Sequence, residues 1–199
     1  MYLRTIALLM TASLLLSVRG ANAQGTGTDG IVSEVRLGLL AHDLHALGGV
    51  ENGADVNGEV LFVSPVPDTA VQDLPSALRW LLQPRPHVGF DANTSGYTDQ
   101  FYAGATWTLL LAQHVLTPDD GLFLDLGGGG AVNDGHTSTS LPNRKQLGSN
   151  VLFHLSAELG YRFARRWSVS AYFEHSSNAD LSYYNESLNE AGMRIGFRF

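Results

Sequence analysis

A histidine and a serine stand two positions apart near the C-terminal end of the 199-residue chain, at His175 and Ser177. The surrounding run, 171–180, has the alternating character of a β-strand. Residues i and i+2 of a strand point to the same face, so we expect the imidazole to lie beside the hydroxyl. A histidine in this position can take the serine proton, which turns a weak nucleophile into one able to attack an ester.

The face that this pair shares is apolar. Counting back by twos from His175 gives Phe173, Ala171, Val169 and Trp167. The alternate positions hold Glu174, Tyr172, Ser170 and Ser168. In a soluble sheet an apolar face of this kind forms the core, whereas in a membrane barrel it faces lipid. In the second case the pair would be a hydrolytic site that faces the bilayer.

The N-terminus predicts export. Residues 1–23 combine a basic residue at Arg4, an apolar run over 6–16 and an Ala-Asn-Ala ending at Ala23. This pattern is typical of a signal peptide, and its apolar run is too short for a spanning helix. We expect cleavage before Gln24 and a single β-barrel domain over 24–199.

Composition excludes several kinds of site. The chain has no cysteine, so disulfides and thiolate metal sites are excluded. Its formal charge of −7 becomes about −9 without the predicted signal peptide, because Arg4 and Arg19 leave 10 basic against 19 acidic residues. Such a chain binds nucleic acid poorly. The His42-x-x-His45 pair has neither a helical setting nor a third ligand, so we expect no metal and no cofactor.

Eight segments alternate apolar and polar residues with a period of two. They span residues 32–41, 56–63, 87–93, 101–111, 122–127, 151–163, 167–177 and 191–199. The glycine run 127–130 lacks the motif of a phosphate-binding loop and is interpreted as a strand end that needs small side chains. Mean hydropathy is 0.00, a value that soluble proteins and transmembrane barrels share, so only the periodicity separates these classes.

The polar positions of these segments favour a membrane barrel over a soluble sandwich or a lipocalin-like barrel. They mix long charged residues with Gly, Ser and Thr, as expected inside a narrow lumen where small residues make room for paired charges. The charged residues of this set are Glu158, Arg162, Glu174, Arg194 and Arg198. The chain also ends on an aromatic residue, Phe199. We therefore predict an all-β protein, an eight-stranded antiparallel transmembrane β-barrel of the outer membrane.

Connection lengths predict how the barrel is oriented. With both ends in the periplasm, the short 164–166 connection is a periplasmic turn and the polar 134–140 segment belongs to an external loop, which is the usual pattern. The long periplasmic connection 64–84 is an exception, and we expect a helical turn or two over 74–82 at the interface. Ser177 then lies at the top of a rising strand, level with the outer leaflet.

Longer sequence motifs around the His175–Ser177 pair resemble those of a known family. The run His175-Ser-Ser-Asn-Ala179 and the final strand with its preceding residues, 185–199, resemble the C-terminal signature of the outer-membrane lipid A 3-O-deacylases. Supporting matches lie at 40–43, 56–59, 84–87, 121–128 and 147–149. The resemblance implies an eight-stranded barrel with a His/Ser/Glu triad on its lipid-facing surface. It also implies hydrolysis of the ester that holds the 3-hydroxyacyl chain at position 3 of lipid A.

The resemblance assigns a role to each matching position. Ser177 is the implied nucleophile, His175 the general base, and Asn178 a donor of the oxyanion hole. The third, acidic position of the triad falls on Asn189, whose amide can orient a histidine but stabilises an imidazolium less than a carboxylate does. Glu190, redirected by a bulge, or Glu186, in the preceding loop, stay open as substitutes.

The implied partners are lipids. The expected substrate is lipid A of lipopolysaccharide, within outer-membrane lipid, and whether the barrel forms a homodimer stays open. Two alternatives also stay open: a non-catalytic small barrel with a structural or adhesion role, which Asn189 in place of an acid motivates, and an outer-membrane phospholipase that uses the same chemistry.

Overall fold

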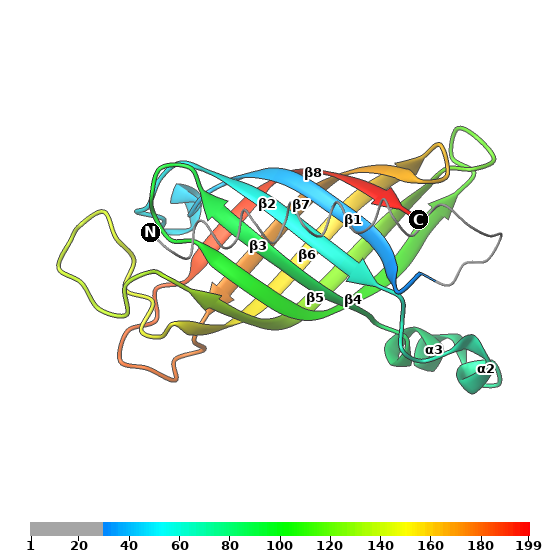
Figure 1. Cartoon of the computed structure of the whole chain (residues 1–199), viewed down its shortest axis with the longest axis horizontal. Coiled ribbons are helices and arrows are strands. Elements are labelled where there is room, and N and C mark those ends of the chain that lie inside the picture. Colours follow the sequence, from blue (N-terminus) through cyan, green and yellow to red (C-terminus); the bar gives the residue numbers. More distant parts are fainter. Residues whose placement is uncertain (1–29) are drawn as a thin grey trace. The chain divides into compact units, whose positions relative to one another are not determined.

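The computed structural model describes residues 30–199, and the predicted signal peptide lies outside the described residues. Eight strands form a closed barrel in which each pairs antiparallel with the next and β8 pairs with β1 (Figure 1). They are β1 Val32–Ala41, β2 Ala54–Phe62, β3 Arg85–Asn93, β4 Gln100–Gln113, β5 Gly121–Asn133, β6 Val151–Phe163, β7 Trp167–Ser177 and β8 Leu188–Arg198. The predicted eight-stranded antiparallel barrel is confirmed.

The alternation of β7 illustrates why these residues form a barrel wall. Trp167, Val169 and Phe173 are exposed on the outside, while the intervening residues, among them Glu174, are buried inside. An exposed apolar surface of this kind is stable in lipid, because the strands satisfy one another's backbone groups and leave only side chains at the surface.

Ion pairs fill the part of the interior nearer the start of β1 and the end of β8. The Arg36 guanidinium lies 2.5 Å from both Asp125 and Glu158 and 2.8 Å from Glu34. Arg194 pairs with Glu158 as well. These arginines are 2% exposed, so their charges are stable there only because carboxylates surround them. Two of the five charged residues that were expected to pair inside the lumen, Glu158 and Arg194, thus pair with each other.

The four glycines at 127–130 lie inside β5, and the expectation of a strand end there was wrong. A Cβ atom on Gly129 would lie 2.1 Å from the carbonyl oxygen of Ala103, on the neighbouring strand β4. Glycine is thus required by the close approach of two strand backbones, and the strand continues past it to Asn133.

The connection between β2 and β3 contains two short helices, α2 Asp68–Val71 and α3 Ser76–Leu82, which confirms the predicted helical segment. They lie beyond the ends of β2 and β3, at the end of the barrel that carries the C-terminus (Figure 1). The indole N–H of Trp80 donates to the Thr108 carbonyl, and that of Trp107 donates to the Leu81 carbonyl, both at 2.9 Å. Over residues 30–199, no helix has the length and apolar character to cross a membrane.

The turn between β4 and β5 is organised around one carboxylate. Asp120 accepts hydrogen bonds from the backbone N–H groups of Val115, Leu116 and Thr117 at 2.6–2.9 Å, and from the Tyr161 hydroxyl at 2.6 Å. Burial by itself raises the pKa of this carboxyl, but the four hydrogen bonds outweigh it and lower the pKa to about 2.

The lowered pKa predicts how the turn responds to acid. A carboxyl with a depressed folded-state pKa contributes stability above its ordinary pKa of about 4, and this contribution is lost as the pH falls toward 2. We therefore expect Asp120→Asn to have a lower unfolding temperature than the wild type at pH 7, with the difference closing between pH 4 and pH 2. Circular dichroism melting in detergent micelles measures this, and a pH-independent difference would contradict it.

Candidate active site

The side chains of Ser177, His175 and Asn189 form a continuous hydrogen-bonded line across β7 and β8. Ser177 Oγ lies 3.0 Å from His175 Nε2, and His175 Nδ1 lies 2.8 Å from Asn189 Oδ1. The structure therefore brings together the three positions that the sequence singled out as nucleophile, base and third member.

The third residue determines the protonation of the histidine. Because an amide oxygen only accepts hydrogen bonds, Nδ1 must carry a proton, and in the neutral ring Nε2 is then the acceptor for the serine hydroxyl. The Nδ2 group of Asn189 donates to Ser187 Oγ at 3.1 Å, which fixes the amide with its oxygen toward His175. Ser187 is a participant that the sequence analysis did not identify.

Regular strand pairing positions the group. His175 is the register partner of Asn189, and the β7–β8 ladder runs without a shift from Trp167 to Ser176. On the other side, Leu155 and Phe153 of β6 stand opposite His175 and Ser177, and both are exposed on the outer surface. The polar line is thus set in an apolar outer surface, with His175 and Ser177 half-buried and Asn189 buried.

Neither substitute glutamate reaches the histidine. Glu190 is the register partner of Glu174 and is fully buried inside the barrel, since the ladder contains no bulge that would turn it outward. Glu186 lies in the loop before β8, where its carboxylate accepts the backbone N–H of Gln146 at 2.6 Å. The contact to His175 is made by Asn189.

Asn178 follows the serine directly and connects two loops. Its Nδ2 group donates to the carbonyl oxygens of Leu147 and Tyr184 at 2.8 and 2.6 Å, and its backbone N–H donates to Asn185 Oδ1 at 2.9 Å. All three of its N–H donors therefore have protein acceptors, and the residue holds the 134–150 and 178–187 loops together above the strand ends.

A shallow groove of about 370 Å³ lies on the outside of the barrel, next to the polar line. It crosses β5 to β8, and small outward residues form its floor where larger side chains stand on either side. Its outward-pointing lining residues are Leu124, Ala157, Leu159, Ala171, Phe173 and Ala191. The outward alanines were visible in the sequence, but only strand register reveals that they adjoin one another.

Comparison with known proteins agrees with this architecture. No curated protein matches the chain. Among solved structures, the crystal structure of the outer membrane enzyme PagL matches with a TM-score of 0.62 at 15% identity, over 84% of this chain and 100% of the other. The N-terminal β-barrel domain of Pseudomonas aeruginosa OprF matches with a TM-score of 0.52 at 13% identity, over 85% of this chain and 98% of the other. At these identities the likeness establishes the fold.

The family comparison goes further. The model of the family described as lipid A 3-O-deacylase (PagL) matches residues 72–198, which include β3 to β8 and all the residues of the polar line. The protein is an outer-membrane β-barrel that belongs to the lipid A 3-O-deacylase (PagL) family.

Proposed function

We propose that the protein hydrolyses the ester-linked 3-hydroxyacyl chain at position 3 of lipid A, with Ser177 as the nucleophile and His175 as the general base. The observation that carries the proposal is the Ser177–His175–Asn189 hydrogen-bonded line on the outer surface of the barrel. A site in that position meets its substrate within the membrane, which suits an ester at the base of an acyl chain.

The chemistry follows from the hydrogen-bond directions. Ser177 Oγ attacks the ester carbonyl carbon as its proton moves to His175 Nε2, which forms a tetrahedral oxyanion. When the ester C–O bond breaks, His175 returns the proton to the departing sugar oxygen, leaving the acyl chain on Ser177. Water activated by the same histidine then releases the free 3-hydroxy acid and restores the serine.

Asn189 is proposed to keep His175 in the productive tautomer. The imidazolium that forms during the reaction would hydrogen bond to a neutral amide, and such a bond is weaker than one to a carboxylate. We therefore propose an enzyme with the complete geometry of a triad and a lower rate than an acidic third member would give.

Asn178 remains the proposed donor to the oxyanion on the family resemblance. Its donors are occupied, so this role requires one of its bonds to Leu147 or Tyr184 to be exchanged for the oxyanion. Loss of a single oxyanion donor typically costs about 10²–10³ in rate.

The outer groove supports an acyl substrate. On its floor, Ala157 and Ala191 are the β6 and β8 register partners of Phe173, which is one outward position from His175 on β7, and Ala171 is the next outward residue along β7. A hydrocarbon chain lying along this depression would have its ester end beside Ser177. A phospholipid chain could lie there as well, so both lipid classes belong in the assay.

The matched pair Ser177→Ala and Ser176→Ala tests the nucleophile. Ser176 adjoins Ser177 but faces the interior, where it is fully buried and hydrogen bonds to Gln100 and His154. We expect Ser177→Ala to lower release of 3-hydroxy fatty acid by about 10³-fold or more, and Ser176→Ala to retain most of it.

Mass spectrometry of lipid A and of phospholipids from cells making each variant gives the readout, and heat modifiability on gels confirms that each barrel is folded. An active Ser177→Ala protein would reject the assignment. Unchanged lipid A with loss of phospholipid acyl chains would favour the phospholipase, and no hydrolysis of either lipid class would favour a non-catalytic barrel.

A second prediction concerns Asn189→Asp. The substitution keeps the shape and places a carboxylate 2.8 Å from Nδ1, while the Ser187 hydroxyl can reverse its role and donate to the new oxygen. Because a charge-assisted hydrogen bond is about twice as strong as a neutral one, we expect the rate to rise about tenfold, with Asn189→Ala below the wild type. Initial rates on purified lipid A measure this, and a folded but slower Asn189→Asp enzyme would contradict it.

A further inference from the structure

A second group of chemically capable side chains lies inside the barrel, behind the candidate active site. It contains His42, which follows β1, together with Asp55 of β2, Asp91 of β3, Glu174 of β7 and Glu190 of β8. All five side chains are buried, and none of them takes part in the proposed hydrolysis.

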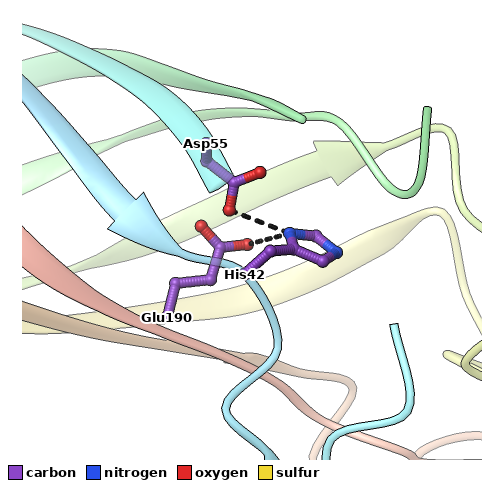
Figure 2. A group of neighbouring side chains, drawn as sticks. All are labelled: His42, Asp55 and Glu190. Carbon is purple, nitrogen blue, oxygen red and sulfur yellow. Dashed lines mark hydrogen bonds and ion pairs between the residues drawn. The ribbon is translucent and has the colours of Figure 1, made fainter. Parts of the chain in front are cut away.

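His42 and two of the carboxylates converge on one point. Asp55 Oδ2 lies 2.8 Å and Glu190 Oε1 3.4 Å from the same ring nitrogen, His42 Nδ1 (Figure 2). The other ring nitrogen, Nε2, lies 3.0 Å from Glu51 Oε2. A carboxylate on the far nitrogen of a histidine fixes the ring and makes its other nitrogen a better metal ligand.

Glu190 also belongs to a second group of three, with Asp91 and Glu174. In each group the potential ligand atoms lie within 4.8 Å of one another. Within residues 30–199, neither carboxylate oxygen of Glu190 has a hydrogen-bond partner, and nor does Asp91 Oδ2. Buried carboxylate oxygens normally have partners, so three such atoms side by side point to a missing ligand.

The charge of this region points to a cation. In the described part of the chain, no lysine or arginine forms an ion pair with any of the four carboxylates. The basic side chains that contact them are two histidines, His42 beside Asp55 and Glu190, and His154 at 3.7 Å from Glu174. The arginine-rich part of the interior is different, because Arg36 and Arg194 stand among its carboxylates.

We propose that His42, Asp55 and Glu190 bind a divalent cation of the Zn²⁺ or Mn²⁺ type, with Asp91 and Glu174 as additional oxygen ligands or as acceptors for a bound water. One imidazole nitrogen with several carboxylate oxygens is a donor set that suits these ions. No metal was expected here because His42 was paired with His45 in the sequence, and His45 is exposed in the loop after β1, where it is hydrogen bonded to Gly49 and Asn52.

A proton competes with a metal ion for His42 Nδ1. Both ring nitrogens of His42 face carboxylates, Nδ1 facing Asp55 and Glu190 and Nε2 facing Glu51, and a doubly protonated imidazolium would also satisfy this arrangement. A metal ion must therefore displace the proton from Nδ1, and measurable metal affinity separates the two occupants.

Such an ion would connect the strands that carry the candidate active site. Glu174 and Glu190 are register partners, and their immediate neighbours His175 and Asn189 are register partners on the opposite face. An ion bound by both glutamates would join β7 and β8 directly behind the His175–Asn189 hydrogen bond, so its binding should stabilise the barrel.

Equilibrium dialysis against Zn²⁺ and against Mn²⁺, followed by elemental analysis, tests the proposal on the tag-free mature chain after treatment with a chelator. We expect about one ion per chain with one of the two metals, and a higher unfolding temperature when that ion is bound. Glu190→Gln should weaken binding at least about tenfold and remove the thermal shift. It should still fold, because it removes one of several adjacent buried carboxylates.

Glu59→Gln is the matched control, since Glu59 is an equally buried interior glutamate that pairs with Arg194 and Arg36. It should bind the ion as the wild type does, even if the barrel is less stable. Asp55→Asn provides a second ligand variant and should lose the ion as Glu190→Gln does. A wild-type protein that binds neither metal, or binding that survives both ligand substitutions, would overturn the proposal in favour of the proton.

Discussion

Because β8 pairs with β1, every strand of the barrel has two neighbours, and each wall side chain must face either the interior or the surrounding lipid. The rest of the structure depends on this constraint. On β7 and β8 it separates adjacent residues completely: His175 and Asn189 face outward, while Glu174 and Glu190 face inward. The candidate catalytic group and a buried carboxylate cluster thereby lie on opposite faces of the same two strands.

Charge pairing in the interior explains how a barrel with so many buried polar side chains can be stable. Arg36 and Arg194 each contact several carboxylates, which keeps buried charges paired in one part of the lumen. In the other part no arginine or lysine pairs with Asp55, Asp91, Glu174 or Glu190 within residues 30–199, and both carboxylate oxygens of Glu190 lack a hydrogen-bond partner, which is the physical basis for inferring a cation there. With its interior occupied by protein, the barrel would carry the proposed hydrolysis on its outside, where a lipid substrate could approach laterally.

Much of the barrel and of the candidate site could be predicted from sequence. Alternate residues of a strand point to opposite faces, so the odd or even position of a residue, its parity, assigns it to one face. Parity placed His175, Ser177 and Asn189 on one surface, and the structure brings all three into contact. Parity does not predict contacts between residues of strands that are distant in the sequence. The His42, Asp55 and Glu190 cluster depends on the register of β1, β2 and β8, and the bonds of Asn178 depend on how two loops fold. The glycine run 127–130 was misread because what requires glycine at Gly129, the close backbone of β4, lies on another strand.

The central claim is that Ser177 is an activated nucleophile open to the membrane. Covalent labelling of the folded barrel with a lipophilic fluorophosphonate, followed by peptide mass mapping, tests this most directly. The account predicts a label on Ser177 and none on its neighbour Ser176, with labelling lost in His175→Ala. A folded barrel whose Ser177 stays unlabelled, or is labelled equally without His175, would contradict it.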